Sequence, residues 1–274
     1  MTTPLGACRA RHRGRKFSAL MFGTLMVSAP GVPVLAATPA PRTQVGGAGD
    51  MQRFGVKSAA LHATVGFRIL VTSPPPPGGH LDLLLLIHGA NAHDEQWDDV
   101  GIDDAVKARS EDGRFRPTLV VLPDGDSAMA PAGTDAPFAT FLLHELLPAL
   151  ARKYPISKAR SHRSIGGISR GGMWALTIAS DHPDLFSRVG GHSAVVPTGA
   201  AAGAMARVFA RHRLRVWVDV GESDALEPND RAFAEAVRGA GASVTFEQHP
   251  GIHDRAYWRS QSPEYAAFYA GAAA

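Results

Sequence analysis

The residues with the clearest chemical potential in this chain are a serine and the two glycines around it. Gly167-Ile168-Ser169-Arg170-Gly171 has the spacing G-x-S-x-G. That spacing suits a strained turn between a strand and a helix, because only glycine leaves room for the two elements to approach closely. Residues 162–168 are typical of a short strand and residues 171–180 of a helix. The pattern therefore predicts that Ser169 is a nucleophile held out of a sheet at a helix N-terminus.

A nucleophilic serine needs a base, and the base needs an acid to orient it. Asp224 follows a predicted strand at 214–220, and His253 follows another at 244–248. The carboxyl ends of parallel strands meet at one edge of a sheet, so Ser169, Asp224 and His253 are expected to converge there. Their chain order is the one that serine hydrolases on open α/β sheets use. We predict that His253 takes the proton of Ser169 and that Asp224 orients the imidazole.

Other residues compete for the last two roles. Asp219 and Glu222 are alternative acids, and His249 is an alternative base. Asp219 is expected inside a strand and Glu222 at the very start of its loop, whereas His249 precedes a stiff proline. Asp224 and His253 are therefore favoured.

Catalysis by a serine also needs donors for the developing negative charge. The loop after the predicted strand 83–87 contains His88-Gly89-Ala90-Asn91. We expect the backbone N–H groups of Ala90 and Arg170 to form this oxyanion hole, with Asn91 as the alternative to Ala90. The simpler interpretation is that the loop makes only a turn.

Several residues near these loops are candidates for substrate binding, although large aromatic residues also commonly fill a core. The candidates are His88, Asn91, Trp97 and Trp258.

Two histidine pairs raise the alternative of a metal hydrolase. His249 and His253 are four residues apart, and His88 and His93 precede an aspartate. Two histidines at a spacing of four share a face only on a helix, and Pro-Gly at 250–251 disfavours a helix there. The sequence therefore predicts no metal site and no cofactor.

The elements that position these residues alternate between strand and helix. This alternation predicts an α/β fold whose mostly parallel central sheet has helices on both faces. The run Leu-Leu-Leu-Leu-Ile at 83–87 is typical of a strand buried on both sides. Pro148 is expected to kink a helix at 138–154. The other expected strands are 61–72, 118–122, 162–168, 186–191, 214–220 and 244–248, and the other helices are 102–108, 171–180, 200–212, 229–239 and one beginning near 254.

The first 36 residues are set apart by their composition. A basic cluster at 9–16 precedes a mostly apolar run and then small residues ending in Val34-Leu35-Ala36, the order of a cleaved signal peptide. A basic tail or a membrane anchor is the alternative, but Gly23, Pro30 and Pro33 interrupt the apolar run, so no stable anchor is expected. We predict a signal peptide at 1–36, a flexible lead-in at 37–58 and one catalytic domain at 59–274, with a secreted or periplasmic destination.

The net charge has to be interpreted with this leader in mind. The chain has 274 residues, a formal net charge of +3 and a single cysteine, Cys8. Residues 1–36 carry five basic and no acidic residues, and removing those charges leaves −2 for the remainder. The basic isoelectric point therefore gives no argument for nucleic-acid binding. The mature chain would also contain no thiol and no disulfide.

Several segments, in order, resemble the esterase family of the α/β-hydrolases. That family includes esterase D-type enzymes, feruloyl and acetyl-xylan esterases, enterochelin esterases and mycolyltransferases. The resemblance implies ester hydrolysis through an acyl-enzyme without a cofactor, with Ser169, Asp224 and His253 as the triad. Arg170 and His192-Ser193 depart from the family pattern. The matching segments are LLLLIHG at 83–89, RPTLVVLPDG at 116–125, FLLHELLPAL at 141–150, GISRGG, HPDLFSRVGGHSA at 182–194, GESD and PGIHDRAYW.

The sequence thus predicts an exported serine esterase acting on a small-molecule or carbohydrate-linked ester. Two alternatives remain. An acyltransferase would use the same triad to move the acyl group to an alcohol or sugar, and a binding module would retain the fold without catalysis. The oligomeric state and the acyl and alcohol groups are left open.

Overall fold

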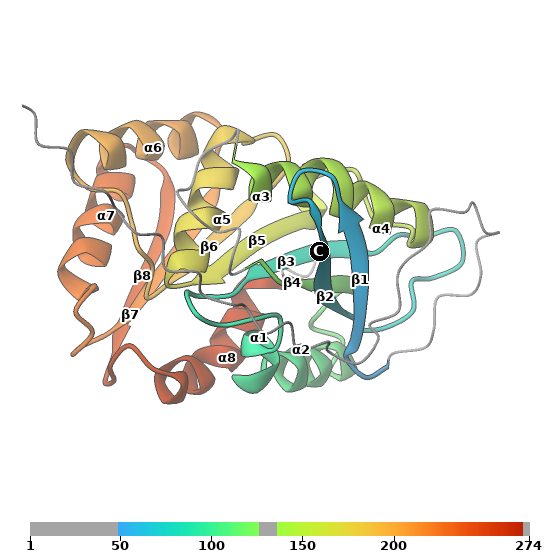
Figure 1. Ribbon diagram of the computed structural model, residues 1–274. Coiled ribbons are helices and arrows are strands. Elements are labelled where there is room, and N and C mark those ends of the chain that lie inside the picture. The colour runs from blue at the N-terminus through green and yellow to red at the C-terminus, as the bar shows by residue number, and fades with distance from the viewer. Residues whose placement is uncertain (1–48, 126–135, 271–274) are drawn as a thin grey trace, which may run out of the picture. The chain divides into compact units, whose positions relative to one another are not determined.

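The computed structural model describes residues 49–125 and 136–270. An eight-stranded sheet of order β1-β2-β4-β3-β5-β6-β7-β8 forms its centre (Figure 1). The pairs from β4 through β3 to β8 are parallel, and β1 and β2 are antiparallel to their neighbours. The strands are β1 (Gln52–Ser58), β2 (Ala63–Val71), β3 (Asp82–Ile87), β4 (Thr118–Pro123), β5 (Arg163–Ile168), β6 (Arg188–His192), β7 (Arg215–Gly221) and β8 (Ser243–His249).

Helices cover both faces of the sheet, which confirms the predicted α/β architecture (Figure 1). On one face lie α3 (Pro137–Thr140), a π-helix (Phe141–Leu146), α4 (Leu147–Lys153), α5 (Arg170–Asp181), α6 (Gly199–Arg211) and α7 (Glu227–Gly239). On the other lie α1 (Gln96–Asp99), α2 (Ile102–Glu111) and α8 (Arg255–Tyr269). A short 3₁₀-helix (Arg160–His162) leads into β5.

Strand β3 shows how the sequence builds this arrangement. Leu83, Leu85 and Ile87 pack into the core under α3 to α7. Leu84 and Leu86 pack into the core under α1, α2 and α8. Side chains alternate between the faces of a strand, so a continuous apolar run is needed where both faces are covered. The predicted two-sided burial of this strand is confirmed.

The predicted flexible lead-in is wrong for residues 52–58. These residues form β1, which pairs with β2 from Gln52 opposite Ile69 to Ser58 opposite Ala63. The strand lies at the edge of the sheet and half of it is exposed, so it lacks the apolar run of a central strand. The predictions for residues 1–36 and 37–48 lie outside the described residues.

The helix expected at 138–154 is present, with a local change of geometry in front of Pro148. The chain passes from α3 through a π-helical turn at Phe141–Leu146 into α4, with the proline in the first turn of α4. Proline has no N–H for a carbonyl of the preceding turn, so a wider turn at this place relieves the mismatch.

No helix within residues 49–125 and 136–270 has the length and apolar character that crossing a membrane requires.

Candidate active site

Ser169 stands at the turn between β5 and α5. Its backbone has φ 55° and ψ −118°, a conformation that residues with a side chain rarely adopt. Its N–H donates to the carbonyl oxygen of His192 at 2.8 Å, and its carbonyl oxygen accepts from the N–H of Val195 at 3.1 Å. The strained residue is therefore held by the loop that follows β6.

The two glycines of the motif are required by backbone contact. A Cβ atom at Gly167 would lie 2.2 Å from the carbonyl group of Gly171, and one at Gly171 would lie 2.2 Å from the carbonyl oxygen of Ile87. These distances are far below any normal contact. The spacing G-x-S-x-G thus allows β5, α5 and the end of β3 to meet beneath the serine.

His253 and Asp224 complete a line of hydrogen-bonded groups. Nε2 of His253 lies 3.0 Å from Oγ of Ser169, and Nδ1 lies 2.8 Å from Oδ2 of Asp224. The other carboxylate oxygen of Asp224 accepts from the N–H of Leu226 at 2.9 Å. The side chain of Asp224 is fully buried, whereas that of His253 is 35% exposed. The three side chains come from the loops after β5, β7 and β8, as the sequence predicts.

The start of α8 holds the histidine loop. Asp254 caps this helix by accepting from the N–H of Tyr257 at 2.9 Å. The ring of Trp258 meets the imidazole of His253 edge-on, with centroids 5.1 Å apart. Its indole N–H donates to Oγ of Ser193 at 3.2 Å. The imidazole therefore rests on an aromatic wall that is tied to the loop after β6.

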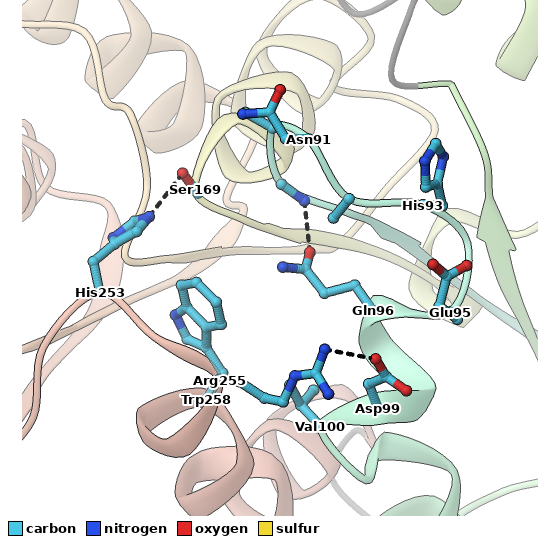
Figure 2. A pocket seen from close by; sticks show the side chains of 13 residues that line it. Asn91, His93, Glu95, Gln96, Asp99, Val100, Ser169, His253, Arg255 and Trp258 are labelled. Atoms are coloured by element: carbon cyan, nitrogen blue, oxygen red, sulfur yellow. Dashed lines mark hydrogen bonds and ion pairs between the residues drawn. The ribbon is translucent and has the colours of Figure 1, made fainter.

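A cleft of about 380 Å³ opens beside Ser169 and His253 (Figure 2). One wall is the loop after β3, and the other is the start of α8. An ion pair of 2.9 Å between Arg255 and Asp99 bridges the far end. The lining is mixed polar and apolar and consists of Gly89, Ala90, Asn91, Ala92, His93, Glu95, Gln96, Asp99, Val100, Ser169, His253, Arg255 and Trp258.

Two contacts fix the loop after β3. The side chain of Gln96 accepts from the N–H of Gly89 at 2.7 Å (Figure 2). The buried carboxylate of Asp94 forms ion pairs with Arg53 of β1 at 2.6 Å and with Arg68 of β2 at 3.2 Å. The loop is therefore anchored both within the cleft and to the antiparallel strands behind it.

A buried polar network lies between β6, β7 and α8. Nδ1 of His192 lies 2.5 Å from Oδ1 of Asp219, and Nε2 lies 2.8 Å from the hydroxyl of Tyr269. The hydroxyls of Tyr257 and Tyr265 donate to the other oxygen of Asp219 at 3.0 and 2.9 Å. Burial and the nearby carboxylate of Asp219 raise the pKa of Tyr257, Tyr265 and Tyr269 well above the ordinary value. These hydroxyls therefore keep their protons and act as donors.

Asp230 of α7 is a second buried carboxyl group near the nucleophile. One oxygen accepts from the N–H of Ala194 at 3.1 Å, and the other is buried without a hydrogen-bond partner. Burial, together with the charge of nearby Asp219, raises the pKa of Asp230 to about 9. The carboxyl group therefore holds its proton at neutral pH while it positions the loop after β6.

Residues 58–268 match the family described as “Putative esterase”. The chain belongs to this esterase family. It is therefore a carboxylic ester hydrolase, and its fold is that of the α/β-hydrolases.

Solved structures show the same fold at low sequence identity. A ferulic acid esterase superposes on the esterase with a TM-score of 0.69 at 21% identity, over 81% of this chain and 97% of the other. An S-formylglutathione hydrolase from Staphylococcus aureus gives 0.68 at 18% identity, over 81% and 100%. The enterobactin esterase from Shigella flexneri gives 0.67 at 18% identity, over 82% of this chain and 59% of its own.

Two residues of the esterase that were predicted to bind substrate do not line the cleft. Trp97 is 1% exposed, and its indole N–H donates to the carbonyl oxygen of Ile87 at 3.1 Å. His88 is also 1% exposed, with Nδ1 2.7 Å from the carbonyl oxygen of Gly89 and Nε2 3.2 Å from the N–H of Gly125. Both predictions are wrong because the two rings are turned inward, that of His88 directly after β3 and that of Trp97 within α1, where they stabilise the intervening loop from below.

The roles predicted for the remaining residues stay predictions, and the structure gives their positions. Ala90, Asn91 and Trp258 line the cleft, and Arg170 is the first residue of α5.

Two of the three alternatives considered for acid and base are engaged elsewhere, and the third, Glu222, has an exposed side chain. Asp219 belongs to the buried network, and His249 lies 3.3 Å from the carboxylate of Glu247. His93 lies 3.2 Å from the carboxylate of Asp124.

Two functional contacts in the esterase were missed by sequence reasoning. Gln96 and Asp230 each hold a backbone N–H of a loop beside Ser169. Asp230 lies on a helix whose sequence is strongly charged, so no pattern marks it as buried. For Gln96 the sequence contains only a weak indication. It follows the predicted oxyanion loop closely enough for one helical turn to bring its side chain back to that loop.

Proposed function

We propose that this esterase cleaves its substrate through an acyl-enzyme formed on Ser169. The observation that carries the proposal is the continuous hydrogen-bonded line from Ser169 through His253 to the buried Asp224. As Oγ of Ser169 bonds to the carbonyl carbon of the ester, Nε2 of His253 takes its proton. The imidazolium then gives that proton to the leaving alcohol as the ester C–O bond breaks. Water attacks the acyl-enzyme with the same base, which releases the acid and restores the serine.

Two backbone N–H groups are proposed to stabilise the tetrahedral intermediate. Ala90 lines the cleft beside Ser169, and Arg170 starts α5, whose N-terminus carries partial positive charge. The neighbouring N–H of Gly89 already donates to Gln96, which favours Ala90 as the donor from this loop. Asn91, with φ 57°, is the alternative.

The cleft supports a substrate of modest size with a polar part. Its volume of about 380 Å³ and its ion pair between Arg255 and Asp99 fit a small ester with a polar or sugar alcohol better than a long acyl chain. A ferulic acid esterase and an S-formylglutathione hydrolase are among the solved structures of this fold. A panel of p-nitrophenyl esters of rising acyl length, beside feruloyl and acetylated sugar esters, should show highest kcat/KM for short or aromatic acids on polar alcohols.

The exposure of His253 favours water over another alcohol as acceptor. Its side chain is 35% exposed, so water reaches the acyl-enzyme from the cleft. We therefore propose hydrolysis rather than acyl transfer. With an added acceptor alcohol, free acid should remain the main product, and a dominant transesterified product would reverse this assignment.

The decisive experiment is the substitution Ser169→Ala. It should lower kcat on a short p-nitrophenyl ester by at least about 10³-fold, because no group remains to form the acyl-enzyme. The far-ultraviolet circular dichroism should be unchanged. Ser180→Ala, in the last turn of α5, is the matched control and should keep full activity. Full activity in Ser169→Ala would overturn the proposal.

We also propose that the protein is exported. The basic, then apolar, then small-residue order of residues 1–36 supports this. N-terminal sequencing of the protein from a bacterial host that makes the full chain should give a mature start at Ala37, in the periplasm or the medium. An intact leader on a cytosolic product would contradict the proposal.

A further inference from the structure

Three side chains with metal-binding groups meet at the end of the sheet opposite Ser169. His80 precedes β3, Asp82 is its first residue, and His162 precedes β5. One donor atom from each lies within 4.8 Å of the other two. This is the sole such group of three within residues 49–125 and 136–270. Ser169 follows the carboxyl end of β5, so the cluster is separated from it by the length of the strand.

Strand geometry explains why residues far apart in sequence converge here. His80 and Asp82 are two residues apart in extended chain, so their side chains point to the same side. Leu83 pairs with Arg163 in the parallel register of β3 and β5, which brings the preceding residues Asp82 and His162 together. The rings of His80 and His162 meet edge-on, with centroids 4.6 Å apart.

The backbone that carries two of the three groups is firmly held. Leu81, between His80 and Asp82, is fully buried. Its N–H donates to the carbonyl oxygen of Pro155, and its own carbonyl oxygen accepts from Ser157, both at 2.9 Å. The N–H of Asp82 donates to Pro117 at 2.8 Å. The backbone beneath these side chains is thus fixed before any ligand arrives, which reduces the entropy that binding would cost.

The carboxylate of Asp82 is held on both of its oxygens within the cluster. Nδ1 of His162 lies 2.7 Å from Oδ1 of Asp82, and Nε of Arg116 donates to Oδ2 at 2.9 Å. Ligating carboxylates are commonly oriented by such a second hydrogen bond. A tetrahedral zinc ion with bonds of about 2.0–2.1 Å keeps its donor atoms roughly 3.3 Å apart. His162 and Asp82 therefore need to separate only slightly, and the exposed ring of His80 is free to turn.

We propose that His80, Asp82 and His162 form a non-catalytic binding site for a divalent transition-metal ion of the zinc type. Two imidazoles and one carboxylate suit zinc, nickel or copper, whereas magnesium and calcium prefer oxygen ligands alone. Water completes the coordination on the exposed side. The guanidinium of Arg116 contacts Asp82, and that of Arg188 interacts with it electrostatically, so positive charge opposes the ion. We expect micromolar rather than nanomolar affinity.

The bound ion would tie the loop before β3 to the entry of β5. That loop is rich in proline and glycine at 73–79. Because the ion binds the folded state, it raises the free energy of unfolding with the logarithm of the zinc concentration once that concentration exceeds Kd. The site does not depend on the proposed catalytic mechanism, and esterase turnover is not its readout.

The test is zinc titration of the full mature chain without an affinity tag, followed by calorimetry and by thermal unfolding. The wild type should bind one zinc ion per chain with micromolar affinity, and its Tm should rise with zinc and not with magnesium. His80→Ala and His162→Gln should each weaken binding by at least about tenfold and abolish the Tm shift. His144→Ala removes an exposed histidine from the π-helix and is the matched control, which should bind as the wild type does.

His80→Ala is the stricter variant, because this exposed side chain contributes no buried contact and the protein should fold normally. Wild-type affinity in folded His80→Ala would overturn the proposal, since the zinc would then be held by other histidines. Absence of any binding by the wild type at millimolar zinc would overturn it as well.

Discussion

At the scale of single residues, the nucleophile depends on two positions where a single added carbon atom does not fit. The backbone of α5 approaches the end of β3 at Gly171, and a Cβ there would lie 2.2 Å from one carbonyl oxygen and 2.4 Å from the next. Backbone cannot move aside as the end of a side chain can. We predict that Gly171→Ala destabilises the fold by about 3 kcal/mol, the upper part of the range seen for overpacking of a core, and displaces Ser169.

Urea unfolding and the rate on a short ester measure the two effects together. Gly203→Ala in α6 is the control, because the nearest atom to its Cβ would be the flexible end of Arg207 at 3.4 Å. That change should leave activity intact and stabilise slightly, since alanine favours a helix. Equal behaviour of the two variants would show that the elbow tolerates a side chain.

Asp230 makes the stability of the fold depend on pH. The pKa of this carboxyl group is about 9 in the folded protein against 3.8 in an ordinary setting, because of burial and the charges of Asp219, Asp224 and Glu227. The folded state therefore holds a proton that the unfolded chain releases. The stability from this group is complete below about pH 4 and is lost progressively as the pH rises to about 9, with a slope of about 1.4 kcal/mol per pH unit.

Asp230→Asn removes the titrating proton while keeping an oxygen for the N–H of Ala194. We predict that the stability of the variant relative to the wild type improves steadily between pH 6 and pH 8. Urea unfolding at several pH values in that range measures the slope. A difference between the two proteins that stays constant with pH would show that Asp230 is ionised in the folded state.

At the scale of elements, the loop between β3 and α1 is held by one side chain of the helix that follows it. Gln96 accepts from the N–H of Gly89 at 2.7 Å, next to the proposed donor Ala90. We predict that Gln96→Ala lowers kcat by about tenfold with little change in KM, because a loosened donor weakens the transition state more than the bound ester. Steady-state kinetics on one p-nitrophenyl ester separates the two constants.

Glu95→Ala is the matched control for this loop. Glu95 lines the same cleft one residue earlier, and none of its described contacts is a hydrogen bond to the loop backbone. Its removal should leave kcat within about twofold. A comparable loss in both variants would assign the effect to the polarity of the cleft rather than to the position of the loop.

The elements also show where sequence patterns succeed and where they stop. Strand β3 and the strand–turn–helix around Ser169 were predictable, because burial on both faces and backbone crowding each leave a strong pattern. Strand β1 was not, since a half-exposed edge strand has no continuous apolar run. Trp97 and His88 were wrongly predicted to line the cleft. Their positions in the sequence do not say whether a ring points outward into the cleft or inward into the core.

At the scale of the whole molecule, parallel topology brings distant residues together in a predictable way at one edge. Ser169, Asp224 and His253 each follow a strand, so chain order alone places them on one rim. The register between strands and the packing of helices are less visible in a sequence. The cluster of His80, Asp82 and His162 and the burial of Asp230 depend on them, which is why neither was expected.

Because β8 lies at the edge of the sheet, we expect the segment that carries His253 to unfold more easily than the centre of the molecule. This strand ends the sheet, with a strand partner on one side only, and its residues are half-exposed. His253 follows it by four residues, whereas Ser169 rests on strands in the middle of the core. Peripheral segments open at lower free energy than central ones. With increasing guanidinium concentration, ester turnover should therefore be lost at a lower concentration than the circular dichroism signal. The enzyme would become inactive while most of its secondary structure remained folded. Coincident midpoints of the two transitions would contradict this.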